Sequence, residues 1–198
     1  MTIAIVGSGA IGSALARRFA AKGLGVQIAN SRGAASIQPL VQELGDVIWP
    51  VELDQALAAE IVLFAAPFAA APVILGQVPD WKGRIVVDAT NAINFTNFTP
   101  TDLGGRLSSE VVAEAAVGAR LVKGFNTLPA AVLAAAPEFA GGHRVLFLAG
   151  DDDNANKEIS RLATALGFFP VILGKIAEGG RLQQFGGALI THNLIKIG

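Results

Sequence analysis

Three glycines near the start of the chain have the spacing of a phosphate-binding turn. Gly7, Gly9 and Gly12 follow a short apolar run, Ile3 to Val6, and stand at the start of an amphipathic segment. The first glycine permits a tight turn, the second lets a pyrophosphate approach the backbone, and the third allows a helix to pack closely on a strand. Free N–H groups at the start of that helix would face the phosphates. An ordinary strand-to-helix turn is the alternative. The predicted dinucleotide-binding turn consists of Gly7, Ser8, Gly9, Ala10, Ile11 and Gly12.

A polar group follows the next apolar run, Val26 to Ala29, where NAD-binding folds place a carboxylate for the ribose 2′-hydroxyl. Here the residues are Asn30, Ser31 and Arg32, with no acid among them. An arginine at this point can pair with a 2′-phosphate and stack on the adenine, and we expect N–H groups from Gly33 onward to contribute. The pattern favours NADP(H) over NAD(H), and a solvated turn is the alternative.

Composition argues against several other functions. Fifteen basic and sixteen acidic residues give a net charge of −1, which provides no field to attract nucleic acid or an anionic membrane. The chain has no cysteine and two separate histidines, His143 and His192, so we expect neither thiolate chemistry nor a metal site. It also has no tyrosine and no Ser/His/Asp arrangement. No residue pattern typical of acid–base or nucleophilic catalysis stands out.

The apolar content raises the question of a membrane span. Hydrophobic residues make up 52% of the chain, and its mean hydropathy is +0.52. The longest uncharged apolar stretch, 61–78, contains Pro67 and Pro72, which indicates a strand, a turn and a helix. No basic leader precedes the first apolar run. We predict no membrane partner and a cytoplasmic location, because parallel strands buried on both faces explain the hydrophobicity.

Strand and helix patterns alternate along the chain and would position these residues. This order is typical of an α/β protein, and we predict a single-domain Rossmann fold over residues 1–198 with a doubly wound, mostly parallel sheet. A stretch without regular period, 92–105, is expected to be a functional loop. The expected strands are 3–6, 26–29, 46–53, 61–65, 84–88, 120–125, 145–149 and 169–173. The expected helices include 34–44, 108–117, 154–166 and a C-terminal helix, 180–197.

Several motifs occur together in one order. They are Gly7–Gly12, Asn30–Gly33, Asp88–Asn91, Phe125–Pro129, Gly150–Asp152 and Gly180–Leu182. In this order the chain resembles, over its whole length, the NADPH-dependent F420 reductases and the related predicted dinucleotide-binding oxidoreductases. It is also similar to the cytosolic part of the STEAP metalloreductases. The resemblance implies hydride transfer between NADP(H) and a second redox partner, which is coenzyme F420, a flavin or another small acceptor.

The resemblance also implies where the two ligands lie. Ligands of open α/β sheets bind at the carboxyl ends of the strands. Phe95 and Phe98 are candidates for the acceptor pocket, although phenylalanine is more often a core residue. The implied contacts are Ala66, Pro67 and Phe68 beside the nicotinamide ribose, Asn91 and Ala92 at the border of the ring, and Asn126, Thr127 and Leu128 opposite.

Two functions are compatible with these features. The first is an NADPH-dependent oxidoreductase with a small-molecule redox acceptor, and the alternative is a sensor or interaction module that holds NADP(H) without turnover. Related β-hydroxyacid dehydrogenases continue into a helical substrate domain, so a catalytic lysine of their kind is not expected here. The expected terminal helix carries Leu182, Phe185 and Leu189, which pack on its own sheet or on a second subunit. The sequence therefore does not decide between a monomer and a homodimer.

Overall fold

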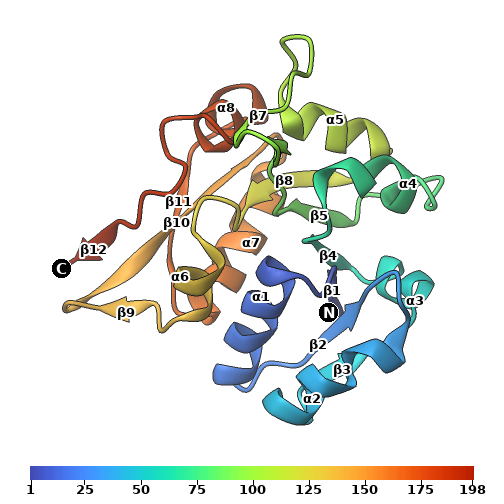
Figure 1. Ribbon diagram of the computed structural model, residues 1–198. Coiled ribbons are helices and arrows are strands. Elements are labelled where there is room, and N and C mark those ends of the chain that lie inside the picture. Colours follow the sequence, from blue (N-terminus) through green and yellow to red (C-terminus); the bar gives the residue numbers. More distant parts are fainter.

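The computed structural model describes residues 1–198, which form one mostly parallel sheet with helices on both faces (Figure 1). The strand order is β3-β2-β1-β4-β5-β8-β10-β11, and every neighbouring pair from β3 to β8 is parallel. This order confirms the predicted α/β class, although β10 runs antiparallel to β8. The strands are β1 Ile3–Val6, β2 Val26–Ala29, β3 Ile48–Pro50, β4 Ile61–Phe64, β5 Ile85–Asp88, β8 Arg120–Gly124, β10 Gly142–Gly150 and β11 Phe169–Ile172.

Helices connect these strands, and most of them are short. Short 3-10 turns, Ala34–Ile37 and Phe68–Ala70, precede α2 and α4, and a π-helical turn, Ile176–Gly180, precedes α8. The helices are α1 Ala10–Ala21, α2 Gln38–Leu44, α3 Leu53–Leu57, α4 Ala71–Leu75, α5 Ser108–Ala115, α6 Ala130–Ala134, α7 Asp153–Ala165 and α8 Arg181–Gln183.

None of these helices combines the length and the apolar character needed to span a bilayer.

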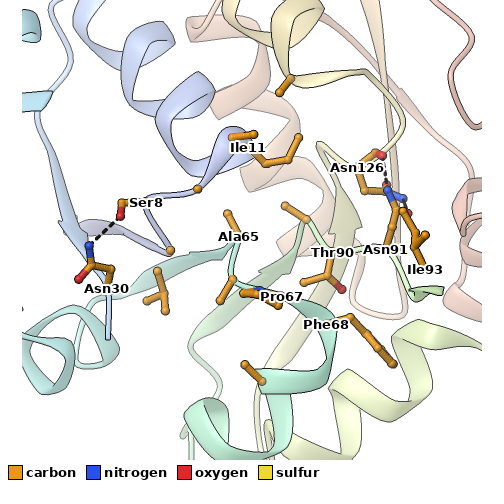
Figure 2. A pocket seen from close by; sticks show the side chains of 18 of the residues that line it. Ser8, Ile11, Asn30, Ala65, Pro67, Phe68, Thr90, Asn91, Ile93 and Asn126 are labelled. Atoms are coloured by element: carbon orange, nitrogen blue, oxygen red, sulfur yellow. Dashed lines mark hydrogen bonds between the residues drawn. The ribbon is translucent and has the colours of Figure 1, made fainter. Parts of the chain in front are cut away.

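Minor strands extend the sheet at one end and form a separate hairpin. Two short strands, β9 Glu138–Phe139 and β12 Ile195–Ile197, both pair with the first residues of β10. The hairpin consists of β6 Ile93–Asn94 and β7 Thr99–Pro100, and it lies within the stretch predicted as a loop. It leads toward the edge where the carboxyl ends of the parallel strands meet, and a pocket opens along that edge (Figure 2).

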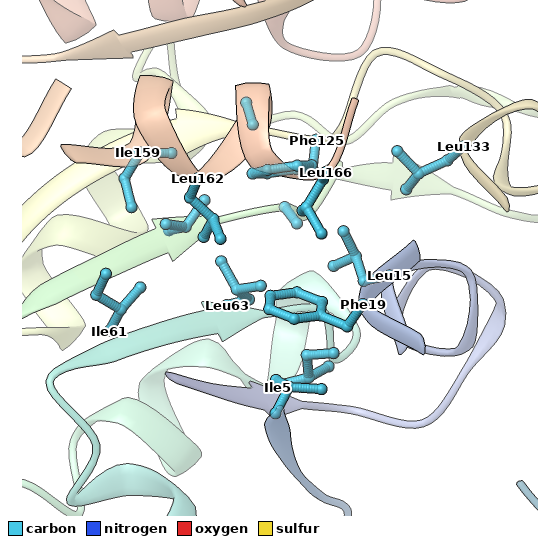
Figure 3. Close-up of a cluster of buried hydrophobic side chains, with 14 of the residues drawn as sticks. Ile5, Leu15, Phe19, Ile61, Leu63, Phe125, Leu133, Ile159, Leu162 and Leu166 are labelled. Carbon is cyan, nitrogen blue, oxygen red and sulfur yellow. The ribbon is translucent and has the colours of Figure 1, made fainter. Parts of the chain in front are cut away.

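Alternate residues of the parallel strands supply two cores. Ile5 and Leu63 face α1 and α7 on one side of the sheet (Figure 3), whereas Val6 and Phe64 face the layer of α3, α4 and α5 on the other. Every residue of β4 and β5 is buried. Continuous apolar runs of this kind are typical of parallel strands that are covered on both faces.

Several predicted boundaries differ from the structure. The third strand was expected at 46–53 but covers only Ile48–Pro50. Leu107 occupies the N-cap position of α5, and its backbone N–H donates to the Glu110 carboxylate at 2.8 Å. Pro67 lies in an extended conformation one residue before the 3-10 turn Phe68–Ala70, which precedes α4.

The predicted C-terminal helix, 180–197, is wrong. Only Arg181–Gln183 are α-helical, and the chain then turns back and ends in β12. The chain leaves the helix at Gln184, which has an extended conformation with a ψ of 160°, and Gly186 then has a φ of +88°. A Cβ at Gly187 would lie 2.6 Å from carbonyl oxygens of α8. The apolar residues there have a helix-like spacing, but the glycine pair prevents a helix from continuing through them.

Candidate functional site

A cleft of about 990 Å³ follows the carboxyl ends of the parallel strands (Figure 2). Its volume lies at the upper end of the range for small-molecule sites, roughly 300–1,000 Å³. Thirty residues line it, and seventeen of them are hydrophobic. Arg32 is the one charged residue among them. The cleft therefore has one cationic end and a long neutral remainder.

The glycine turn after β1 forms the floor of the cleft at its middle. Gly7 has a φ of +113°, and a Cβ there would lie 2.6 Å from the backbone nitrogen of Ala66. A Cβ at Gly12 would collide with the Gly7 carbonyl oxygen, so α1 packs directly on the turn. At Gly9 a Cβ would meet nothing within 4 Å. Each glycine thus has the geometry expected of a turn whose second glycine is open to a ligand.

The N-terminus of α1 points at this open space. Gly9 caps the helix without any side-chain hydrogen bond. The backbone N–H groups of Ala10, Ile11 and Gly12 have no acceptor within the protein. Free N–H groups and the positive end of the helix dipole make such a terminus a site for phosphate groups. The turn therefore fits a diphosphate.

Asn30 holds the loop after β2 against the glycine turn. Its Nδ2 donates to the Ser8 hydroxyl at 2.7 Å (Figure 2), and its Oδ1 accepts the backbone N–H of Arg32 at 2.7 Å. The Arg32 guanidinium is exposed and makes no salt bridge. A cation at the rim of the cleft is therefore available to an anionic ligand.

Part of the prediction for this loop is wrong. The N–H of Ala34 is not free, because it donates to the Glu52 carboxylate at 3.2 Å, and the N–H of Gly33 bonds to the Asn30 carbonyl. Glu52 follows β3, so the acceptor of the Ala34 N–H comes from the neighbouring strand. No local signal in the sequence connects residues 34 and 52.

The other end of the cleft is lined by the loops after β4, β5 and β8. A hydrogen-bonded pair joins two of these loops, since Asn91 Nδ2 donates to the Asn126 carbonyl at 2.8 Å and Asn126 Nδ2 donates to Asn91 Oδ1 at 3.0 Å. Phe125, just before Asn126, is buried with a φ of +61°, a left-handed conformation that is uncommon for a bulky residue. This geometry fixes the β8 loop at the cleft wall.

All but two of the predicted nucleotide-binding residues line the cleft. Gly12 lies beneath the turn, and Ala92 lines a smaller neighbouring hollow with Pro100 and Phe185. The predicted residues on the cleft wall are Gly7, Ser8, Gly9, Ala10, Ile11, Asn30, Ser31, Arg32, Ala66, Pro67, Phe68, Asn91, Asn126, Thr127 and Leu128.

One wall of the cleft, which is not predicted from the sequence, comes from the C-terminal segment. Phe185, Ile190 and Thr191 line the cleft, and the Thr191 N–H donates to the Thr127 carbonyl at 2.8 Å. Phe95 of the hairpin also lines the cleft, and Phe98, which does not, packs edge-on against Phe95 with ring centroids 6.2 Å apart. This end of the cleft is thus apolar and uncharged.

The N-terminal part of the chain has a recognisable family signature. Residues 2–92, which carry the glycine turn, the Arg32 loop and the β4 and β5 loops, match the family of NADP oxidoreductases described as coenzyme F420-dependent. The match spans 91 of the 198 residues of the chain. The match ends at the start of the hairpin, so it covers the residues around the glycine turn rather than the C-terminal wall.

Two solved structures are similar to this chain along most of its length. A hypothetical protein, SMa0349, from Sinorhizobium meliloti is 52% identical, with a TM-score of 0.96 over 99% of this chain and 96% of that one. A suggested F420-dependent NADP reductase from Arthrobacter sp. FB24 is 25% identical, with a TM-score of 0.74 over 89% of this chain and 86% of that one.

One curated relative is much longer. Metalloreductase STEAP3 of Rattus norvegicus is 29% identical over 186 residues, which are 91% of this chain and 35% of that protein. The chain therefore spans about a third of the length of STEAP3. A reductive aminase from Aspergillus terreus, 21% identical with a TM-score of 0.63 over 90% of this chain and 56% of that one, shares the fold.

Proposed function

We propose that this protein binds NADPH along the cleft and passes its hydride to a planar, conjugated acceptor such as coenzyme F420 or a flavin. One observation carries the proposal: the cleft runs from its single cation, past the free N–H groups of α1, to a neutral apolar end. NADPH has a matching order of groups: the 2′-phosphate lies at one end, the diphosphate lies in the middle, and the uncharged dihydronicotinamide ring lies at the other end.

The donor half of the cleft has a group for each anionic part of NADPH. The N-terminus of α1 would hold the diphosphate, and the open space above Gly9 would let it approach the backbone. Arg32 would pair with the 2′-phosphate. No carboxylate follows β2 to prefer a free 2′-hydroxyl. These features support NADPH over NADH as the donor.

The acceptor half has the shape and polarity for an aromatic ring system. Its walls come from Phe68, Ile93, Phe95, Phe185 and Ile190. When bound, NADPH supplies a hydride to the ring of the second ligand. The cleft wall contains no carboxylate, histidine, lysine or tyrosine, so the proton that completes the reduced acceptor comes from water. The residues then act by holding two rings together and excluding solvent between them.

The relatives support this assignment in part. The family description names NADP and coenzyme F420, the Arthrobacter protein carries a matching name, and STEAP3 is a metalloreductase. The first two names give NADP and F420, whereas the name of STEAP3 gives a metal, so the acceptor differs among these relatives. The acceptor is therefore best identified by experiment.

Rapid mixing of the protein with NADPH and a panel of acceptors tests the proposal. The panel contains F420, FMN, FAD, quinones and ferric chelates. We expect NADPH oxidation well above the uncatalysed rate with at least one tricyclic ring acceptor, and slower oxidation of NADH. If no acceptor oxidises NADPH faster than in buffer, the enzyme assignment fails. Binding of NADPH without oxidation would favour the sensor alternative.

A further inference from the structure

A buried ion pair lies directly behind one of the loops that line the cleft. Asp88, at the end of β5, and Lys123, in β8, are register partners in neighbouring parallel strands. Both side chains are completely buried, and Lys123 Nζ lies 2.9 Å from Asp88 Oδ2. Neither residue lines the cleft. The proposed hydride transfer does not use them, so their role needs another explanation.

The pair holds the loop through Thr90. Lys123 Nζ donates to the Thr90 carbonyl at 2.6 Å. The second oxygen of Asp88 accepts both the backbone N–H of Thr90, at 2.9 Å, and its hydroxyl, at 2.7 Å. Every polar group of Thr90 is therefore bound on the buried side of the loop.

Stability is a poor explanation for this pair. Desolvation of two charges offsets most of their attraction, and replacing a buried ion pair by apolar residues of similar size is often neutral or stabilising. The surroundings offer such a replacement, since Val86 and Leu121, two residues earlier in each strand, belong to an apolar core. Asp88 and Lys123 differ from these apolar residues in that they hydrogen-bond to Thr90, in the loop after β5 that lines the cleft.

The hydrogen bond from Lys123 to the Thr90 carbonyl determines the direction of the next backbone N–H, that of Asn91. The bond between Thr90 and Asn91 is trans, so the N–H of Asn91 points opposite to the Thr90 carbonyl. Because that carbonyl faces the buried ammonium, the N–H faces away from it. The backbone N–H of Asn91 has no acceptor within the protein, and Asn91 lines the cleft. A charge-assisted bond to the carbonyl also polarises the peptide and strengthens the N–H as a donor.

We propose that Lys123 is a positioning residue that holds the Asn91 backbone N–H as a hydrogen-bond donor for a carbonyl oxygen of a bound redox ring. The oxygen belongs either to the carboxamide of nicotinamide or to a carbonyl of the acceptor ring. The inference rests on the proposed function, because both rings come from it. It adds a specific contact at the ring end of the cleft, where no side-chain cation exists.

The amide resonance of Asn91 in the ¹⁵N-labelled full chain reports this contact directly. We expect its proton to move downfield on binding NADP⁺ and not on binding 2′-phospho-ADP-ribose, which lacks the ring; this result identifies the carboxamide. A downfield movement only after FMN or F420 is added to the NADP⁺ complex identifies the acceptor carbonyl. If the amides of the glycine turn respond to NADP⁺ but Asn91 responds to none of these ligands, the inference is overturned and NADP binding stands. If no amide responds, both proposals fall.

A double variant tests the part played by Lys123. Lys123→Met with Asp88→Asn removes both charges together, so no lone charge is left buried. We expect 2′-phospho-ADP-ribose to bind as in the wild type, whereas the ring-dependent movement of the Asn91 amide disappears and the ligand whose carbonyl binds there loses roughly three- to tenfold in affinity.

A matched control and a second readout separate positioning from stability. Arg120→Met, at the opposite end of β8 and outside the cleft, should leave the Asn91 amide and both affinities unchanged. If the double variant keeps the ring-dependent movement of the amide, Lys123 has no positioning role, whatever happens to the unfolding temperature. If the double variant does not fold, the wild-type amide measurement alone decides whether the donor is used.

Discussion

At the scale of single residues, the proposed preference for NADPH over NADH depends on the charge of Arg32. The guanidinium is exposed and is the one charged group on the cleft wall. In Arg32→Ala a charge-assisted contact of about 1.5–3 kcal/mol is lost, so NADPH binding should weaken roughly ten- to a hundredfold while NADH binding stays the same. Calorimetric titration with both nucleotides measures this. Equal affinity of the wild type for NADPH and NADH would contradict the preference.

Glu52, which follows the neighbouring strand β3, places a carboxylate close to the Arg32 loop. Its carboxylate accepts the N–H of Ala34, two residues beyond Arg32. Glu52→Gln keeps an acceptor for that N–H but removes a negative charge near the phosphate, so NADPH affinity should rise by up to about fivefold. Glu114→Gln, on α5 and paired with Arg106, is the control and should have no effect. A fall in NADPH affinity on Glu52→Gln would show that the carboxylate helps to hold the nucleotide.

At the scale of elements, an ion pair connects α1 with β9 and makes their contact depend on pH. A hydrogen bond from Lys22 at 2.9 Å is the main cause that lowers the pKa of the Glu138 carboxyl below its usual value. The ionised form is thus favoured in the folded state, so the stabilisation is present above the unfolded-state pKa and is lost as pH falls through the folded-state pKa. Thermal unfolding should show the wild type more stable than Glu138→Gln near neutral pH, with the difference disappearing in acid. A difference that grows as pH falls would contradict this sign.

The C-terminal segment should determine acceptor binding rather than donor binding. Phe185 belongs to the apolar end of the cleft, far from Arg32 along the sheet edge. Phe185→Ala removes part of that wall, so the KM for the acceptor should rise roughly tenfold while the Kd for NADPH stays unchanged. Phe139→Ala, an exposed phenylalanine of β9 outside the cleft, is the matched control. Equal losses for donor and acceptor would mean that the segment supports the whole cleft.

At the scale of the whole molecule, the sequence predicts what local patterns encode. The Gly7, Gly9 and Gly12 spacing predicts the turn, because the positive φ of Gly7 and the close approach of Gly12 to the Gly7 carbonyl both belong to one strand–turn–helix unit. The buried strands β4 and β5 are also predicted, since continuous apolar runs are typical of the middle of a parallel sheet. Both results depend on residues that are close together in the chain.

Features that join distant segments could not be predicted in this way. The contact of Glu52 with Ala34, the link between Asp88 and Lys123, and the C-terminal wall all depend on which strands become neighbours. The prediction of a C-terminal helix was wrong for a related reason. Its apolar spacing suggested one helical face, but Phe185 and Ile190 instead enter the cleft on either side of a turn at Gly186.

A crystal structure of the protein with NADP⁺ bound is the most direct test of the central claim. We expect the diphosphate at the N-terminus of α1 and the 2′-phosphate within hydrogen-bond distance of Arg32. The nicotinamide should lie between the β4 and β8 loops, with one face open toward Phe95 and Phe185. A nucleotide bound elsewhere, or a ring whose two faces are both covered by protein, would contradict a cleft that brings a hydride donor and a planar acceptor together.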